Sequence, residues 1–273
     1  MAATVITIAV EKGGCGKTVT TSNLAYLMGD EGKKVLCLDT DPQGNLSKAF
    51  ANRSLYDMID GFRYNTQTRD FIVESEYENV DLIPANDQTP RLSKRLEDLY
   101  TDAQRDYDRG DPKYLASDTD VLDYFLRQVK DEYDYILIDT QPSRDSLLLS
   151  NAIAAADYVL IPLKCDSFSE DSAFRTYVLC NEMRKSKTSR IKGVGVMLTM
   201  VQKSAASQDI RSDCRAKLGA TLFNAEIAFG KSVDNSINRC VPVCYSARTQ
   251  PPAKSYVAAY EELKKRLAEL EEK

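Results

Sequence analysis

The sequence predicts an α/β protein with a doubly wound, mostly parallel sheet and helices on both faces. Six short runs rich in Val, Ile and Leu alternate along the chain with longer amphipathic stretches. Each run is almost continuously apolar, which is typical of a strand buried on both faces of a parallel sheet. Regular alternation of such strands with helices indicates a doubly wound fold, which binds ligands at the carboxyl ends of its strands.

The strands are expected, in chain order, at 4–10, 34–39, 80–85, 133–139, 157–163 and 191–199. Amphipathic stretches predict the helices at 18–31, 89–107, 117–131, 145–156, 168–187 and 204–218. A last helix over 255–273 carries Tyr256, Tyr260 and Leu263 on one apolar stripe. Such a stripe predicts that the helix packs against the rest of the domain.

No repeat, low-complexity tract or flexible linker divides the chain, so we expect a single domain over residues 1–273. A variable polar excursion is expected around 97–120. The wider segment 97–134 carries twelve Asp or Glu against five Lys or Arg. A charge run of this kind usually forms a solvated surface, and an interaction surface is the alternative.

Composition excludes several classes of protein. The chain has no His, which removes the commonest general base and every Ser-His or Cys-His nucleophile. Its seven Cys are odd in number and scattered, which favours a reducing compartment. The absence of a long apolar run and of a basic segment before the first strand predicts a cytoplasmic protein with no membrane helix. A net charge of −5 argues against a wholly basic nucleic-acid binder.

The most informative motif follows the first strand, in the stretch EKGGCGKTVT. Its glycines allow backbone N–H groups to approach phosphate oxygens, and the helix that follows adds the positive end of its dipole. Lys17 would bridge the β- and γ-phosphates, and Thr18 would offer its hydroxyl to Mg²⁺. A plain glycine turn is the alternative. The expected nucleotide-binding residues of this loop are Gly13, Gly14, Cys15, Gly16, Lys17, Thr18 and Val19.

The loop departs from the general phosphate-loop pattern at its first position. Glu11 occupies the place of the first glycine, and a second lysine, Lys12, directly precedes the glycine pair.

Aspartates follow two further strands. Asp39 and Asp41 stand in VLCLDTDPQGN, and Asp139 stands in YDYILIDTQPS. Because the carboxyl ends of parallel strands meet at one edge, these carboxylates are expected near the phosphate loop. They could hold magnesium-bound water or orient an attacking water. Aspartates that only cap helices or form turns are the alternative.

Together, KGGCGKT, LDTDPQGN and YDYILIDTQPS resemble the three signature motifs of the ParA/Soj/MinD family of deviant Walker A ATPases. The stretches SLYDMI, VDLIPAN, ADYVLIPLKCDSFS, GVGVMLTM and VPVCYSARTQPPAKSYVAAYEEL are also similar to the family. The resemblance covers most of the chain and weakens at 61–78 and about 97–120. It implies a P-loop NTPase fold with ATP and Mg²⁺ as cofactors, nearest to ParA/Soj-type proteins without an N-terminal helix-turn-helix.

The resemblance also implies a role for each site residue. In the family, the lysine matching Lys12 reaches across a nucleotide-sandwiched dimer to the partner's phosphates, so Lys12 would act in trans like an arginine finger. Lys17 would serve its own nucleotide, and Asp41 would orient the hydrolytic water, which makes these three the expected catalytic residues. The expected Mg²⁺ residues are Thr18, Asp39 and Asp139. The adenine is expected near VPV, with contacts from Pro242 and Val243.

Some positions depart from the family. Glu11 replaces a commoner amide, and Cys15 stands where Val, Thr or Ser is usual. Gln141 and Arg144 replace proline and leucine in a loop that responds to the γ-phosphate. The stretch MVQKSAASQ leaves no match for a DNA-contacting arginine of the family.

Among the family's functions, the sequence favours DNA partition. Few residues precede the first strand, so no helix-turn-helix is expected. The acidic last helix argues against anchoring in a membrane. The lack of a CxxC motif argues against an iron–sulfur site. We expect a slow ATPase whose ATP-bound homodimer binds DNA without sequence preference, associates with the nucleoid and is stimulated by a ParB-like partner. The alternatives are a MinD-like or cargo-positioning switch that does not bind DNA, and a non-hydrolysing nucleotide-binding scaffold.

Basic residues gather near the end of the chain. The segment between Ile227 and Tyr256 contains four basic residues and one acidic residue, Asp234. Ordinary solvated charge is the alternative to a DNA-binding patch. The candidate DNA-binding residues are Lys231, Arg239, Arg248 and Lys254.

Overall fold

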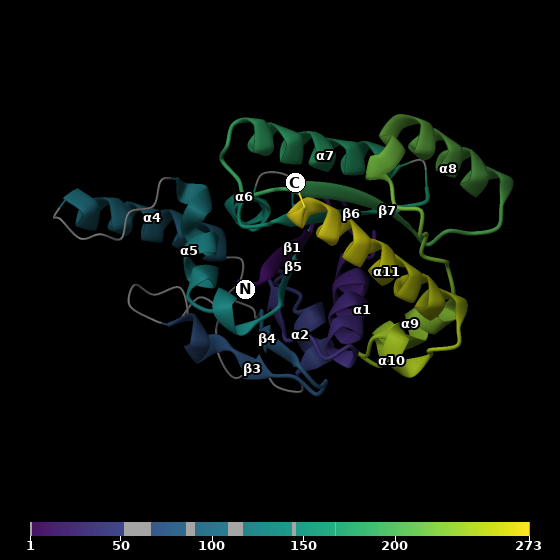
Figure 1. Cartoon of the computed structure of the whole chain (residues 1–273), viewed down its shortest axis with the longest axis horizontal. Coiled ribbons are helices and arrows are strands. Elements are labelled where there is room, and N and C mark those ends of the chain that lie inside the picture. Colours follow the sequence, from purple (N-terminus) through teal and green to yellow (C-terminus); the bar gives the residue numbers. More distant parts are fainter. Residues whose placement is uncertain are drawn as a thin grey trace.

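The computed structural model describes residues 2–51, 67–85, 91–108, 117–143, 146–166 and 168–272. Within these ranges the strands form a seven-stranded sheet in the order β3-β4-β2-β5-β1-β6-β7 (Figure 1). β3 pairs antiparallel with β4, and all other neighbours are parallel. The predicted fold class is therefore confirmed. The strands are β1 Thr4–Ile8, β2 Val35–Asp39, β3 Val73–Glu74, β4 Val80–Ile83, β5 Tyr135–Asp139, β6 Tyr158–Lys164 and β7 Gly193–Thr199.

Helices connect the strands and cover the sheet. They are α1 Lys17–Asp30, α2 Asn45–Phe50, α4 Leu92–Asp108, α5 Val121–Arg127, α6 Leu147–Ala154, α7 Glu170–Lys185, α8 Ala205–Leu218, α9 Lys231–Asn238, α10 Val243–Ser246 and α11 Pro251–Glu271. Short 3-10 turns lie at Thr68–Phe71, Asp118–Asp120, Lys130–Glu132 and Gly219–Thr221. No helix in the described ranges has the length and apolar character needed to cross a membrane.

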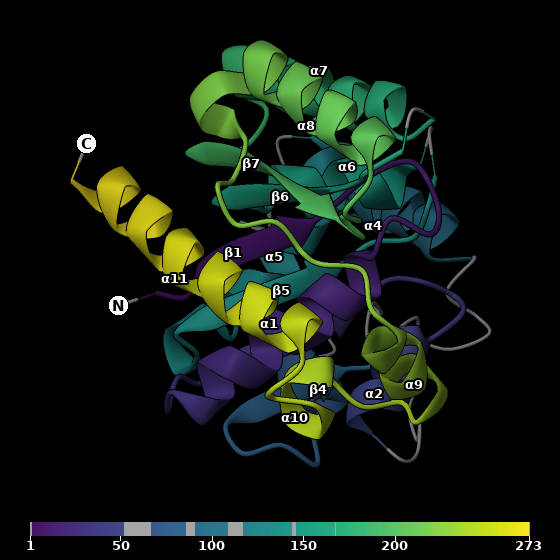
Figure 2. The ribbon, with the colours of Figure 1, turned by 90° about the vertical axis from the view of Figure 1, so that its right-hand side faces the viewer.

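Alternate residues of each strand point to opposite faces of the sheet, so the core has two layers. Ile6 and Ile8 of β1 pack with α1, α2, α10 and α11 on one face. On the opposite face Val5 belongs to a cluster with α4, α5 and α6, and Ala9 to a neighbouring cluster with α6, α7 and α8. Figure 2 shows α1 and α11 on one side of the sheet and α7 and α8 on the other. Burial on both faces is the reason that the strands read as continuous apolar runs.

All six expected strands are present, each within about two residues of its expected ends. The two-residue β3 was not expected, because so short a pairing leaves no periodic signal. The stretch 117–131 forms a 3-10 turn, α5 and a second 3-10 turn rather than one helix; Ser117 and Asp120 form a capping box on the first turn. Within the polar excursion, α4 runs to Asp108, and 109–116 lie outside the described residues, as do 52–66 with SLYDMI.

The last helix packs on the domain as predicted, and it does so against α1. The Tyr256 hydroxyl lies 3.3 Å from Thr20 Oγ1. The Tyr260 hydroxyl donates to Glu31 at 2.5 Å, and Lys264 pairs with the same carboxylate at 2.6 Å. α11 therefore contacts α1, the helix that follows the glycine loop, at both the first and the last turn of α1.

Candidate functional site

The glycine loop joins β1 to α1 at the carboxyl edge of the sheet. Gly14 and Gly16 have φ angles of 71° and 87°, a left-handed conformation that glycine adopts at little cost. Gly16 directly precedes α1, so the unpaired N–H groups of the first helical turn lie next to the loop. The Thr199 hydroxyl donates to the Cys15 carbonyl at 2.9 Å and ties the loop to the end of β7. This backbone can receive an anion such as a phosphate.

Lys17 lies inside this loop. Its side chain is buried, and its Nζ donates to the carbonyl oxygens of Val10 and Lys12, both at 3.1 Å. Burial lowers the pKa of Lys17, against the opposing effect of the Asp139 carboxylate. The glycine loop therefore surrounds a desolvated ammonium group, which could bind an anion.

Asp139 ends β5 beside the start of α1. It is fully buried, and its carboxylate accepts hydrogen bonds from Thr18 Oγ1 at 2.7 Å and Thr21 Oγ1 at 3.2 Å. Burial, and after it the negative charge of Asp39, raises the pKa of Asp139 well above its usual range. Thr21 was not predicted as a site residue, although its place one turn after Thr18 is a signal that could have found it.

Asp39 ends β2 and is the register partner of Asp139 on the neighbouring strand. Its carboxylate accepts the Asp41 N–H at 3.0 Å and both the N–H and the hydroxyl of Ser47, at 2.8 and 2.7 Å. Burial raises the pKa of Asp39. Asp41 is half-buried and accepts the Gln43 N–H at 2.9 Å, so its carboxylate remains at the mouth of the site.

The carboxylates of Asp39 and Asp139 thus lie at neighbouring strand ends, and the Thr18 hydroxyl of α1 contacts Asp139. All their donor atoms are oxygens, the ligands that Mg²⁺ prefers. A divalent cation would also stabilise the ionised form of both carboxylates, which burial disfavours. The residues present therefore fit a magnesium ion held directly or through water.

Lys12 does not join Lys17 in the loop. Its Nζ donates to Ser169 Oγ at 2.9 Å and lies 3.5 Å from Asp166 Oδ1. The ring of Phe168, which is 83% exposed, lies 5.9 Å from the same Nζ. The neighbouring Glu11 pairs with Arg175 of α7 at 2.9 Å. The two residues that depart from the ordinary phosphate loop therefore both contact the segment that follows β6.

The loop after Asp139 closes the other side of the site. Pro142 lies against Gly13, where a Cβ would be 3.8 Å from the proline ring. Gln141 Nε2 donates to Ser146 Oγ at 3.3 Å. Arg144, the other departure in this loop, lies outside the described residues.

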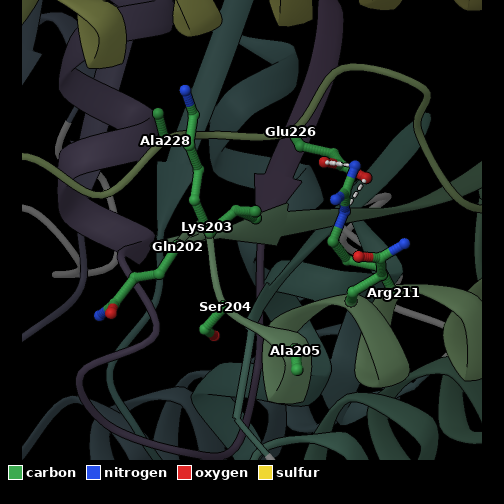
Figure 3. A pocket seen from close by; sticks show the side chains of 9 residues that line it. Gln202, Lys203, Ser204, Ala205, Arg211, Glu226 and Ala228 are labelled. Carbon is green, nitrogen blue, oxygen red and sulfur yellow. Dashed lines mark hydrogen bonds and ion pairs between the residues drawn. The ribbon is translucent and has the colours of Figure 1, made fainter.

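The described residues line two cavities on the carboxyl side of the sheet, and the smaller one reaches the start of α1. The larger, of about 620 Å³, lies between the end of β7, the start of α8 and the segment 226–228 (Figure 3). Lys203 and Gln202 border it, and Arg211 pairs with Glu226 in its wall at 2.8 Å. The smaller, of about 200 Å³, lies beside Thr18.

Pro242 and Val243, the two residues expected to contact the adenine, line neither cavity. Val243 is fully buried in the core, and the N–H next to it, from Cys244, donates to Asn23 Oδ1 at 2.8 Å. Pro242 is also buried, whereas Val241 lines the smaller cavity.

The four basic candidates are all exposed, but they are not equivalent. Gly230, which precedes Lys231, packs closely against Pro252 in the first turn of α11, since a Cβ on Gly230 would lie 2.8 Å from the Pro252 ring. Arg248 instead pairs with Asp30 at 3.3 Å and lies over the Tyr26 ring at 5.6 Å. The structure therefore brings Lys231 near the first turn of α11 and directs Arg248 toward the end of α1.

Comparisons with known proteins agree with this geometry. A family model described as an AAA domain matches residues 3–192. The chromosome partitioning protein ParA of Caulobacter vibrioides is 32% identical over 230 residues, which cover 82% of this chain and 79% of that protein. The sporulation initiation inhibitor protein Soj of Bacillus subtilis is 32% identical over 203 residues, 72% of each chain.

Solved structures show the same fold. An ATP complex of McdA from Cyanothece superposes with a TM-score of 0.78 at 21% identity over 96% of both chains. The cell division ATPase MinD of Pyrococcus furiosus superposes with a TM-score of 0.73 at 21% identity, over 96% of this chain and 99% of that one. By its motifs, its fold and these relatives, the chain belongs to the ParA/Soj/MinD family of deviant Walker A P-loop ATPases.

Proposed function

We propose that the protein is a DNA-partition ATPase: ATP and Mg²⁺ drive a sandwich homodimer that binds DNA without sequence preference, and a ParB-like partner stimulates slow hydrolysis. One observation carries the proposal. The ammonium group of Lys17 points into the glycine loop and donates to its carbonyl oxygens. The ammonium group of Lys12 points away from the loop and donates to Ser169. A loop in which only one of two lysines is placed to bind the protein's own nucleotide suits a site to which a second copy of the chain supplies the other lysine.

The residues at the strand ends have distinct tasks in this proposal. Lys17 and the loop N–H groups hold the phosphates, and Lys12 of the partner subunit adds the second cation across the interface. Thr18, Asp39 and Asp139 hold the magnesium ion, which neutralises charge on the β- and γ-phosphates. Asp41, at the mouth of the site, orients the attacking water. With no His in the chain, a carboxylate is the side chain suited to that task.

The adenine would enter the larger cavity rather than contact Pro242 and Val243. Its volume of about 620 Å³ falls in the usual range of ligand sites, whereas the cavity of about 200 Å³ falls below it. Gln202 lines this cavity, and its amide would pair with the edge of the base. Gln202→Ala should then weaken ATP binding more than Val241→Ala, and the reverse order would return the base to the 241–243 segment.

The DNA-binding surface would centre on Lys231, Arg239 and Lys254, all exposed. Arg248 would contribute less, because its guanidinium group is already engaged by Asp30 and Tyr26. Dimerisation doubles the number of cations on one face. Each phosphate contact steepens the salt dependence of DNA binding by about one logarithmic unit.

Retention of DNA with ATP, with ADP and without nucleotide, measured over a salt series, tests the proposal. Retention should require ATP, and Lys254→Gln should reduce the salt slope by about two units per dimer. Lys94→Gln, which removes an exposed lysine from α4, is the matched control. Retention that ignores the nucleotide would contradict the proposal. Partner-stimulated phosphate release without any DNA retention would favour a cargo-positioning switch, and no phosphate release at all would favour a scaffold. In this proposal the protein is cytoplasmic, associated with the nucleoid and independent of a membrane.

A further inference from the structure

The resting place of Lys12 is built by its own chain. The Lys12 ammonium group donates a hydrogen bond to Ser169 Oγ at 2.9 Å and forms an ion pair with Asp166 Oδ1 at 3.5 Å. Ser169 is completely buried and directly precedes α7, so its hydroxyl has little freedom to turn away. Lys12 keeps about a third of its side-chain surface exposed, so solvent reaches it in this position.

The acceptor group is itself fixed on several sides. Lys164 holds the other oxygen of Asp166 at 3.0 Å, and the Ser169 N–H donates to the Asp166 carbonyl at 3.2 Å. Although partial burial opposes it, the hydrogen bond from Ser169 and the cations Lys164 and Lys12 lower the pKa of Asp166 to about 2. These contacts therefore favour the ionised form of Asp166. The Glu11–Arg175 ion pair fixes the backbone on the other side of Lys12.

We propose that Asp166 and Ser169 are positioning residues for Lys12: they hold it in cis in the free monomer, and it must leave them before it can reach a partner's nucleotide. This inference rests on the proposed function of Lys12 in trans. The contact would then oppose premature dimerisation and keep the free monomer nearly inactive. Release becomes favourable only when a second nucleotide offers stronger anions than one carboxylate and one hydroxyl.

The effect on dimerisation is enlarged by symmetry. Each protomer of a sandwich dimer must release its own Lys12 from the resting position. The equilibrium constant for this release therefore enters the dimer dissociation constant twice, as its square. A half-exposed contact that favours the resting position by about threefold would weaken the dimer by about ninefold. Asp166→Asn removes the negative charge and Ser169→Ala removes the hydroxyl acceptor, each with little change in side-chain volume, and they should tighten the dimer by roughly this factor.

The first experiment asks whether the contact exists. The purified monomer without nucleotide is treated with a limiting amount of an amine-acylating reagent, and labelling of each lysine is followed by mass spectrometry. Lys12 should be labelled about three times faster in Asp166→Asn and Ser169→Ala than in the wild type. Lys33→Gln, which removes an exposed lysine that follows α1, should leave the Lys12 rate unchanged. Equal Lys12 rates in all four proteins would overturn the proposal, provided that thermal unfolding shows the variants folded.

The second experiment asks what the contact does. Dimer dissociation constants are measured by sedimentation with Mg²⁺ and a non-hydrolysable ATP analogue. A constant about ninefold lower in either variant, and unchanged in Lys33→Gln, supports the proposal. An unchanged or higher constant in both variants overturns it. If no protein dimerises, including the wild type, the proposed function fails instead, and the Lys12 labelling rates alone decide whether the cis contact exists.

Discussion

The two lysines of the glycine loop should respond differently to the same substitution. Lys17→Ala removes a buried ammonium group that makes two hydrogen bonds at 3.1 Å inside the loop and that would transfer to phosphate oxygens when ATP binds. Hydrogen bonds to charged groups contribute about 1.5–3 kcal/mol net, which corresponds to a loss of about 10- to 150-fold in ATP affinity.

Lys12→Ala should leave the affinity of the monomer for ATP within about threefold. Its ammonium group contacts Asp166 and Ser169 rather than the loop, and the backbone carbonyl that Lys17 uses survives the substitution. Loss of an exposed or half-exposed ion pair costs about 1 kcal/mol or less. The substitution should instead abolish productive dimerisation and hydrolysis.

The assay is titration calorimetry with a non-hydrolysable ATP analogue at protein concentrations that keep the chain monomeric. Lys33→Ala, at an exposed position after α1, controls for the loss of a positive charge. If Lys12→Ala and Lys17→Ala lost affinity equally, the assignment of Lys12 to the partner's nucleotide would be wrong.

Three further predictions concern hydrolysis, stability and packing. Asp41→Ala should lower partner-stimulated phosphate release by at least about a hundredfold while ATP binding stays within about threefold, as measured by phosphate release and calorimetry; a parallel loss of binding would contradict the water-orienting role. Asp123→Ala should lower the free energy of unfolding by about 3–5 kcal/mol at pH 7, because it strands the buried Lys130, which lies 2.8 Å from it. Although burial opposes it, hydrogen bonds and cations lower the pKa of Asp123, so its stabilisation is present above the unfolded-state pKa near 4 and is lost as pH falls below it. Urea titrations at pH 7 and pH 3 should therefore show the variant's deficit shrinking in acid, and a constant deficit would argue against the ionised pair. Gly195→Ala should cost about 1–3 kcal/mol in the same assay, since a Cβ there would overlap the Tyr158 hydroxyl, and an unchanged midpoint would show that the strand can shift.

The sequence was sufficient for the sheet because the strands are buried on both faces. A run such as YDYILID carries a strong apolar signal, whereas its terminal Asp139 indicates a site only in combination with the phosphate loop that precedes it. The short elements carried no such signal. β3 has two residues, α10 has four, and α9 was hidden by polar residues on its exposed face.

The contacts around the site were harder to predict, because they join residues far apart in the chain. Ser47 supports Asp39 from α2, and Ser169 receives Lys12 from a segment 157 residues away. Neither serine differs in the sequence from ordinary solvated serines. Arg248 likewise looked like one cation of a patch until its pairing with Asp30 gave it a structural partner.

The placement of the chain's two ends has a practical consequence. β1 begins at Thr4 and α11 finishes at Glu271, and both lie at the amino edge of the sheet, where Leu270 packs near Gly193 at the start of β7 (Figure 2). The glycine loop lies at the opposite, carboxyl edge. A dye or affinity handle fused at either end would therefore sit on the side turned away from the nucleotide. Molecules tethered to a sensor chip in this way would present that edge to solution, so pairing with a free second copy could be timed directly.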